Sequence, residues 1–508
     1  MNASDEHSRS LWMSDGPIAE ALPLTADSEA DVAVIGSGIA GLSVAYELVR
    51  QERSVIVIDR GEIGGGMTAR TTAHLASELD DYYHELIRVR GADEARRLHE
   101  SQVAAINRIE AICRDEAIDC DFRRLDGYLI PSEEGAADLL VREFEACREI
   151  GVEVEWAERA PMPGLDSGRC LRFPDQARFH PTRYLRGLAR AIGRRGGRLF
   201  AGTAYVDHRR DGGKVVIESE AGPRLTAAAA VFATNSPVNN RVKIHTKQMP
   251  MRTYAIAGRV PRGSVPDALL WDTLEAYHYV RLQELSDSED WLIVGGEDHR
   301  SGEASDMDAR IAALAEWTRR RYPGFGKLEF SWSGQVMEPI DFMPFSGRNP
   351  GEDNVYIHTG DSGQGITNGV AGALTIAPLI LGQDSRFAEI FDPGRKSLTA
   401  GPSLAEFAEG QVGVLKNMAE HLGPGEIGSI DDLAPGEGGI LRRGAKKVAV
   451  YRAGDGSVSE RWAVCTHAGC VVHWNGFEKC WDCPCHGSQF APDGEVLNGP
   501  AVKPLAEV

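Results

Sequence analysis

The residues best suited to metal chemistry lie near the C-terminus, in the stretch CTHAGCVVHWNGFEKCWDCPCHGS, residues 465–488. This stretch holds five of the chain's nine cysteines and three of its fourteen histidines. Thiolates and imidazoles so close together are ligands that zinc and iron–sulfur clusters both take. The stretch therefore predicts a metal centre, and a structural zinc site is its simplest form.

Four of these residues have the spacing of two paired ligand loops. Cys465-x-His467 is followed, after fifteen residues, by Cys483-x-x-His486. Two thiolates and two imidazoles fit a Rieske [2Fe–2S] centre, in which the thiolates hold one iron and the imidazoles hold the other. We expect Cys465, His467, Cys483 and His486 to be the metal ligands.

The text around these ligands resembles the Rieske family, because CTHAGC and CPCHGS each carry one additional cysteine. In cytochrome bc-type members the additional cysteines form a disulfide that joins the two cluster loops. The resemblance therefore implies a disulfide between Cys470 and Cys485, and it favours an iron–sulfur cluster over zinc. Cys480 lies outside the pattern and is expected to be a free thiol.

One position departs from the family pattern. High-potential members have Ser and Tyr hydroxyls in the phrase GSxY, which donate hydrogen bonds to cluster and ligand sulfur atoms and stabilise the reduced cluster. Here the text is GSQF, so Ser488 is present but Phe490 cannot donate. We expect a lower cluster potential than in the members with Tyr.

A second motif, near the N-terminus, predicts a dinucleotide site. In DVAVIGSGIAGLSVAYELV an apolar strand precedes Gly36, Gly38 and Gly41, and an apolar helix follows. The next strand, SVIVID, ends in Asp59. Glycines let the backbone approach a pyrophosphate at the helix N-terminus, and the acidic residue can take ribose hydroxyls. This pattern alone does not distinguish FAD from NAD.

Two further segments resemble the D-amino-acid-oxidase and glycine-oxidase superfamily of flavoproteins. GGGMTARTTAHLAS follows Asp59, and NVYIHTGDSGQGITNG resembles the closing strand, glycine turn and helix at the isoalloxazine. The resemblance covers most of residues 31–395 and implies FAD as the cofactor. It implies these FAD-binding residues: Gly36, Gly38, Ile39, Ala40, Gly41, Asp59, Arg60, Thr68, Arg70, Thr71, Thr72, His74, Gly360, Gly363, Gln364, Gly365, Ile366 and Thr367.

His74 raises a more specific hypothesis. The phrase TTAHLAS resembles the segment that carries covalent FAD in dimethylglycine-dehydrogenase-like relatives. The alternative is a histidine that packs near the flavin without a bond.

The middle of the chain, residues 80–335, is expected to hold the substrate-binding half. Helical patterning covers residues 80–117 and 134–150, and alternating strands such as EAYHYVRL and DWLIVGGED predict an antiparallel sheet over the flavin. Tyr279 and Arg281 would share one strand face. An amino-acid carboxylate would need a bidentate arginine, and Arg252, Arg281 and Arg348 are the options.

Composition limits the remaining possibilities. A length of 508 residues favours several domains, and a net charge of -20 argues against nucleic acid as a partner. Since no apolar run is long enough to span a membrane and no secretory signal is recognisable, a cytoplasmic location is expected.

The predicted fold is a Rossmann-like α/β FAD domain with an antiparallel substrate sheet, followed by a small all-β Rieske domain. The predicted boundaries are an N-terminal extension (1–30), a flavin and substrate region (31–395), a linker helix (396–424) and the Rieske domain (425–508).

The two predicted centres together indicate an electron relay. The flavin superfamily oxidises C–N bonds of amines and amino acids, including N-methylated ones. The cluster would then pass electrons singly to an external ferredoxin, cytochrome or quinone. The alternative is an electron-transfer component that serves a partner oxygenase, although no second dinucleotide motif is evident for NAD(P)H. A zinc-stapled flavoprotein is the other alternative, and iron and sulfide analysis would identify it.

Overall fold

A parallel strand–helix–strand unit begins the fold in the computed structural model, which describes residues 6–132, 136–163, 166–239, 244–274, 276–396 and 417–508. β1 (Ser28–Ile35) and β2 (Val55–Ile58) lie parallel and are joined by α1 (Ile39–Val49). Every residue of β2 is buried, because the strand is covered on both faces. The apolar sequence of this unit therefore forms the centre of the first sheet.

This first sheet has the strand order β16-β17-β10-β1-β2-β7, and the pairs from β17 to β7 are parallel. The antiparallel strands β8 and β9 extend the sheet beside β10, and β16 pairs antiparallel with β17. The bounds of the added strands are β7 (Arg198–Phe200), β8 (Tyr205–Asp211), β9 (Lys214–Ser219), β10 (Arg224–Phe232), β16 (Phe345–Arg348) and β17 (Val355–Thr359).

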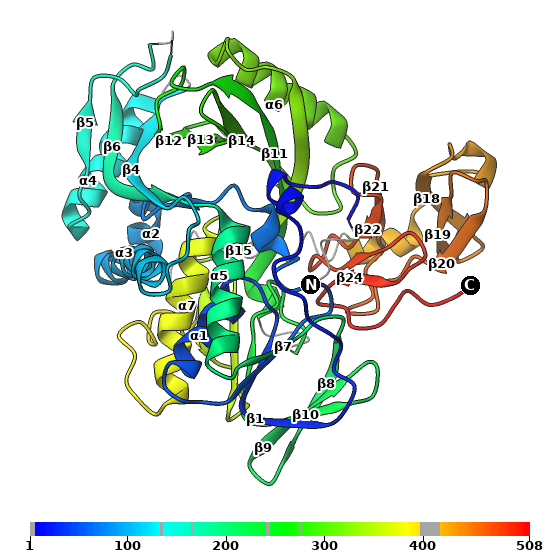
Figure 1. The fold of residues 1–508 in the computed structure, drawn as a ribbon. Coiled ribbons are helices and arrows are strands. Elements are labelled where there is room, and N and C mark those ends of the chain that lie inside the picture. The colour runs from blue at the N-terminus through cyan, green and yellow to red at the C-terminus, as the bar shows by residue number, and fades with distance from the viewer. Residues whose placement is uncertain (1–5, 133–135, 164–165, 240–243, 275, 397–416) are drawn as a thin grey trace.

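Helices cover one face of the first sheet. α1 packs against both α5 and α7, and α3 packs on α7 (Figure 1). The sequence pattern for residues 80–117 is helical throughout, but the structure has two helices, because Gly91 has φ 87° and interrupts the helical backbone. The bounds are α2 (Tyr83–Arg90), α3 (Ala92–Asp115), α4 (Ala136–Ile150), α5 (Pro181–Arg194) and α7 (Gly365–Ile380).

The second sheet forms the upper part of Figure 1, and its strand order is β15-β11-β14-β13-β12-β4-β6-β3, with β5 beside β6. The sheet is antiparallel as predicted, except that β12 pairs parallel with β4. α6 (Met307–Arg321) packs on β11 and β14. The strands are β3 (His74–Leu75), β4 (Arg123–Ile130), β5 (Glu155–Ala157), β6 (Cys170–Arg178), β11 (Gln248–Pro261), β12 (Leu269–Asp272), β13 (His278–Glu284), β14 (Glu289–Arg300) and β15 (Leu328–Pro339).

The C-terminal lobe is all β, and its strands lie on the right of Figure 1. It contains two small antiparallel sheets, β18-β19-β20 and β21-β22-β23-β24. Their bounds are β18 (Glu437–Arg443), β19 (Lys446–Arg452), β20 (Val458–Trp462), β21 (His473–Asn475), β22 (Cys480–Asp482), β23 (Gln489–Phe490) and β24 (Val496–Asn498). The predicted fold class is thus confirmed in all three parts.

The described residues also form short 3-10 helices: η2 (Leu11–Asp15), η3 (Met67–Arg70), η4 (His245–Lys247), η5 (Glu420–Leu422) and η6 (Ile430–Asp432). The predicted linker helix lies mostly outside the described residues, and the four domain boundaries stay predictions. Within the described part of the chain, no helix combines the length and the apolar character that a membrane crossing requires.

A buried network of charged side chains joins the C-terminal lobe to the rest of the protein. Glu478, which follows β21, has no exposed side-chain area, and its Oε1 lies 3.2 Å from Arg70 Nη1 and 3.9 Å from Arg252 Nη1. Glu6 Oε2 lies 3.0 Å from Arg70 Nε, and Asp482 Oδ1 lies 3.3 Å from Arg252 Nη2. Two arginines of the flavin region therefore meet carboxylates from both ends of the chain.

The N-terminal extension takes part in this network. Ser8 donates to Glu478 from its backbone N (3.0 Å) and from its Oγ (2.6 Å), and Arg70 Nη2 donates to the Ser8 carbonyl (2.6 Å). Burial alone would raise the pKa of Glu478, but Arg70 and Arg252 lower it below its usual value. Burial raises the pKa of Glu6 to about 7, although Arg70 opposes that shift. Glu478 thus pairs with both arginines, while Asp482 is the nearer carboxylate to Arg252.

We expect Glu478→Ala to lower the free energy of unfolding by about 3 kcal/mol, because removing one member of a buried ion pair leaves the opposite charge without compensation. Glu460→Ala is the matched control, since Glu460 pairs with the exposed Arg443 and a surface pair contributes about 1 kcal/mol or less. Urea denaturation followed by tryptophan fluorescence measures both variants. Equal losses would show that the buried network does not stabilise the assembly of the lobes.

Candidate functional site

One cavity lies where the first sheet, the second sheet and the N-terminus of α7 meet. Most of the predicted FAD-binding residues line this cavity: Gly36, Gly38, Ile39, Ala40, Asp59, Thr68, Arg70, Thr71, Thr72, His74, Gly363, Gln364, Gly365, Ile366 and Thr367. Segments that are far apart in the sequence are therefore brought together as one dinucleotide-sized site.

The glycines at the start of α1 fit a bound pyrophosphate. Gly36 has φ 101°, and a side chain there would overlap with the carbonyl of Ala233 on the neighbouring strand end. A side chain at Gly41 would overlap with the carbonyl of Gly36, so this glycine sets the packing of the helix on the turn. The backbone can therefore approach a ligand at the helix N-terminus, as the sequence predicts.

Asp59 ends β2 and is hydrogen-bonded to the same turn. Its Oδ2 accepts from Ser37 N at 2.7 Å and from Ser37 Oγ at 2.6 Å. Asp59 also lines the cavity, which places a carboxylate at the position where a ribose is expected. The residues present therefore fit the adenosine half of FAD.

Three predicted FAD-binding residues do not line the cavity. Gly41 lies behind the turn, Arg60 lies 3.8 Å from Glu220 Oε2, and Gly360 has φ 80° in the turn after β17. Arg70 does line the cavity, but its guanidinium donates to Ser8 and Glu478 in the buried network.

His74 lies in the cavity wall as a neutral imidazole. Burial, reinforced by the charge of Arg281, lowers its pKa to about 3. Its Nε2 lies 3.3 Å from the carbonyl of Val280, which can only accept, so Nε2 carries the proton. Its Nδ1 lies 3.2 Å from Thr72 Oγ1 and accepts from that hydroxyl. Both ring nitrogens are therefore engaged by the protein.

The three arginines predicted to bind a substrate carboxylate lie outside the cavity lining. Arg252 belongs to the buried network, Arg348 is exposed at the end of β16, and Arg281 donates to the carbonyls of Ala73 (2.8 Å) and Phe179 (3.0 Å). Tyr279 does line the cavity, beside Tyr277. The structure thus brings the predicted tyrosine to the site and gives the arginines other partners.

Two carboxylates, Asp80 and Asp298, also line the cavity. Asp80 accepts from Tyr277 Oη at 2.9 Å, and Asp298 on β14 is hydrogen-bonded to Thr253. Burial raises the pKa of both carboxyls to about 7. Acidic neighbours of each carboxyl add to this shift. Sequence reasoning missed both residues, because no motif connects Asp80 with a strand more than two hundred positions later.

The C-terminal lobe places the predicted ligands on two facing loops. Cys465 N donates to the carbonyl of Cys470 (2.9 Å), and Cys483 N donates to the carbonyl of Ser488 (2.8 Å). A hydrogen bond between the two thiols lowers the pKa of Cys465 to about 7, which favours the thiolate form that binds metal. The rings of His467 and His486 lie 4.9 Å apart.

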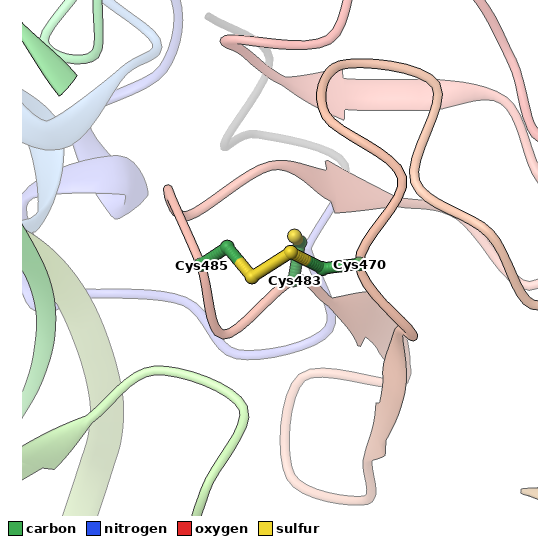
Figure 2. A group of neighbouring side chains, drawn as sticks. All are labelled: Cys470, Cys483 and Cys485. Atoms are coloured by element: carbon green, nitrogen blue, oxygen red, sulfur yellow. A yellow bond between two sulfur atoms is a disulfide. The ribbon is translucent and has the colours of Figure 1, made fainter. Parts of the chain in front are cut away.

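The predicted disulfide is confirmed: Cys470 and Cys485 are bonded, and Figure 2 shows Cys483 beside them. These three sulfur atoms lie close together, but the two in the disulfide offer no thiolate, so the group is not a ligand set. His486 is 9% exposed, and its Nδ1 is buried without a hydrogen-bond partner among the described residues. A buried nitrogen of this kind fits a metal ligand.

Two contacts connect the ligand loops to the flavin region, and one of them reaches the cavity. Gln335 lines the cavity and donates from Nε2 to the carbonyl of Gly487 at 2.7 Å. His245 packs its ring 4.7 Å from the ring of His467 and 5.4 Å from that of His486. Neither residue has a role predicted from the sequence, and only the docking of the two lobes reveals these contacts.

Profiles of two known families match the two parts of the chain that contain these sites. The profile of the family described as "FAD dependent oxidoreductase" (DAO) matches residues 31–379, and that of the "Rieske [2Fe-2S] domain" matches residues 424–508. The chain is 29% identical to the "Putative Rieske 2Fe-2S iron-sulfur protein YhfW" of Bacillus subtilis, over 99% of this chain and 98% of that protein.

Two further similarities cover the flavin region. Gamma-glutamylputrescine oxidoreductase of Escherichia coli is 24% identical over 70% of this chain and 85% of its own length. The crystal structure of glycine oxidase from Geobacillus kaustophilus superimposes with a TM-score of 0.61 at 18% identity, over 73% of this chain and 99% of that chain. At that identity the superposition shows the fold alone.

Because both nitrogens of His74 are hydrogen-bonded, we expect FAD to be released without a covalent bond when the protein is denatured in acid. Mass spectrometry of the denatured chain measures this outcome. A mass increase equal to one FAD would contradict the expectation, and in that case His74→Ala should abolish the increase while Thr72→Ala should retain it.

We expect Phe490→Tyr to raise the cluster's midpoint potential and Ser488→Ala to lower it, because each change adds or removes a hydroxyl near the ligand sulfur atoms. Ser488 is hydrogen-bonded to the side chain of Cys465. Shifts of tens of millivolts are expected, since about 59 mV corresponds to a tenfold change for one electron. EPR-monitored redox titration measures them. Phe477→Tyr, the same change on the β21–β22 turn of that lobe, is the control, and an equal shift there would contradict the hydrogen-bond explanation.

Proposed function

Since the chain belongs to the DAO family of FAD-dependent oxidoreductases and ends in a Rieske [2Fe–2S] domain, we propose that it oxidises the C–N bond of an amine or an N-methyl amino acid. In this proposal electrons leave singly through the cluster to an external acceptor. Membership of both families makes the protein an oxidoreductase that binds FAD and a [2Fe–2S] cluster. The substrate and the electron route are the proposed parts.

The proposed reaction is oxidation of the amine to an imine, followed by hydrolysis of the imine. The amine loses a hydride from carbon and a proton from nitrogen, and water hydrolyses the resulting imine to a carbonyl compound and an amine. FAD supplies the two-electron oxidation, and the cluster supplies the one-electron outlet. The chain's own residues orient the substrate carbon in the cavity and exclude water from it. The names of the amino-acid and amine enzymes among its relatives support this substrate range.

The hydrogen bond from Gln335 to Gly487 is the observation that carries the proposal. Gln335 lines the flavin cavity, and Gly487 lies between His486 and Ser488 in a ligand loop. Asn235 donates to Gln335 Oε1 at 3.1 Å and also lines the cavity, which holds the amide in its orientation. One side chain therefore spans from the flavin site to the cluster loop. Because electron tunnelling rates fall steeply with distance, this short connection supports electron transfer between the two centres.

The acceptor is proposed only as a class, namely a ferredoxin, a cytochrome or a quinone. A cytoplasmic location is part of the same proposal and is supported by five free cysteines outside the ligand loops, Cys113, Cys120, Cys147, Cys170 and Cys480. The alternative of a component that feeds an oxygenase is less favoured, because the sequence contains one strand–GxGxxG–helix unit, and FAD takes it.

We expect anaerobic addition of a substrate amine to bleach the flavin and then to produce the EPR signal of the reduced cluster. In Gln335→Ala the cluster signal should appear at least about tenfold more slowly after bleaching, because the contact between the lobes is lost. Gln383→Ala, at an exposed glutamine after α7, is the matched control. Peroxide formation that equals substrate turnover, or a cluster that stays oxidised beside a bleached flavin, would contradict the proposal.

A further inference from the structure

The substrate end of the cavity is built from two hydrogen-bonded groups of side chains that meet through a ring contact. Asp80 packs against Gly363, where a side chain would overlap with the Asp80 carboxylate, in the turn that precedes α7. Tyr277 donates to Asp80, and its ring lies 5.4 Å from the ring of Tyr279. Tyr279 Oη lies 2.9 Å from Thr253 Oγ1, and Thr253 is hydrogen-bonded to Asp298. The two groups therefore begin at the turn of the flavin site and end at a second carboxylate.

No cationic side chain is available to this end of the cavity. Among the described residues that line it, Arg70 is the one lysine or arginine, and its guanidinium is held by Glu6, Ser8 and Glu478. His74 is neutral. An amino-acid carboxylate placed here would meet two carboxyl groups and no partner cation, which is unfavourable in a low-dielectric site.

The carboxylates themselves lack compensation. Asp298 Oδ1 is buried and has no hydrogen-bond partner among the described residues. Burial first, and then the charge of Asp81, raise the pKa of the neighbouring Glu338 well above its usual value, although Arg300 opposes the shift. Arg310 approaches from α6, but its Nε donates to Asp306 at 2.9 Å and its Nη1 donates to the Glu297 carbonyl at 3.0 Å. Such a group of buried acids is stabilised by a ligand that brings positive charge.

Aromatic side chains add to this preference. Tyr277, Tyr279 and Trp271 all line the same part of the cavity, and ring faces attract ammonium groups. Their arrangement leaves a site with aromatic walls and anionic ends.

We propose that Asp80 and Asp298 select a substrate that carries a second cationic group, of the diamine class, and that they exclude amines with a carboxylate in its place. This inference rests on the proposed amine oxidation and narrows its substrate. In the bound state one amine, deprotonated, presents its C–H bond for oxidation, and the other stays protonated and pairs with the two carboxylates.

A series of amines with the same N-methylated reacting end tests the inference on the holoenzyme. The probes are N-methyl-1,4-diaminobutane, with a second ammonium group; N-methylbutylamine, with a methyl group instead; and 4-(methylamino)butanoate, with a carboxylate. Sarcosine serves as the amino-acid reference. Anaerobic stopped-flow measurement of flavin bleaching gives the limiting rate and the apparent dissociation constant for each probe.

We expect the diamine to bind roughly 30-fold or more tightly than N-methylbutylamine, and the carboxylate probe to bind most weakly. Asp298→Asn and Asp80→Asn should weaken the diamine more than the neutral amine, mainly through the dissociation constant. Asp287→Asn, in the exposed β13–β14 turn, is the control and should change neither. FAD content and the flavin spectrum report whether each variant is folded.

Different outcomes would overturn the cationic-substrate inference and the proposed amine oxidation. Faster bleaching by 4-(methylamino)butanoate or sarcosine than by the diamine would overturn the cationic-substrate inference and leave amine oxidation standing. Equal binding of the diamine and N-methylbutylamine would also overturn it. A flavin that dithionite reduces but that none of the four amines reduces would overturn the proposed function itself.

Discussion

The docking of the C-terminal lobe on the flavin region depends on the buried charges around Glu478. Arg70 and Arg252 both donate to Ser333, and their positive charges would be very costly to bury without a carboxylate from the other lobe. This requirement determines where β21 and β22 lie. It thereby determines that the loop of Cys483 to Ser488 faces the cavity edge, where Gln335 meets Gly487.

The same network holds Glu6 and Ser8 of the N-terminal extension in place. Glu6 pairs with Arg70, and Ser8 donates to Glu478. Further along the extension, Trp12 Nε1 donates to the carbonyl of Thr71 at 2.6 Å. The extension runs over the flavin-binding segment and contacts both lobes. Glu6 and Ser8 have no role predicted from the sequence, because the side chain of Glu478 lies more than 400 positions away along the chain.

The nucleotide end and the substrate end of the cavity obey different constraints. At the nucleotide end, Gly36 and Asp59 belong to one short unit, and local geometry dictates their roles. At the proposed substrate end, Asp80 comes from the segment between β3 and α2, whereas Thr253 and Asp298 lie on the paired strands β11 and β14. Register decides which side chains of β11 and β14 face the cavity, because neighbouring residues on a strand point to opposite faces. Arginine positions that looked suitable in sequence, such as Arg281, instead serve backbone carbonyls.

The disulfide between Cys470 and Cys485 was implied by the resemblance to the Rieske family and is confirmed. The sequence by itself determined the features that contiguous residues encode: the strand–helix–strand unit with its glycines and the predicted ligand loops of Cys465 and Cys483. In each case the spacing within a loop or a turn sets the chemistry. Only the tertiary structure decided the charge of the side chains that line the cavity, the contact of His245 with the predicted ligand histidines and the hydrogen bond from Gln335 to Gly487. Those features depend on which distant side chains share a buried volume, and burial and strand register are properties of the whole packed chain.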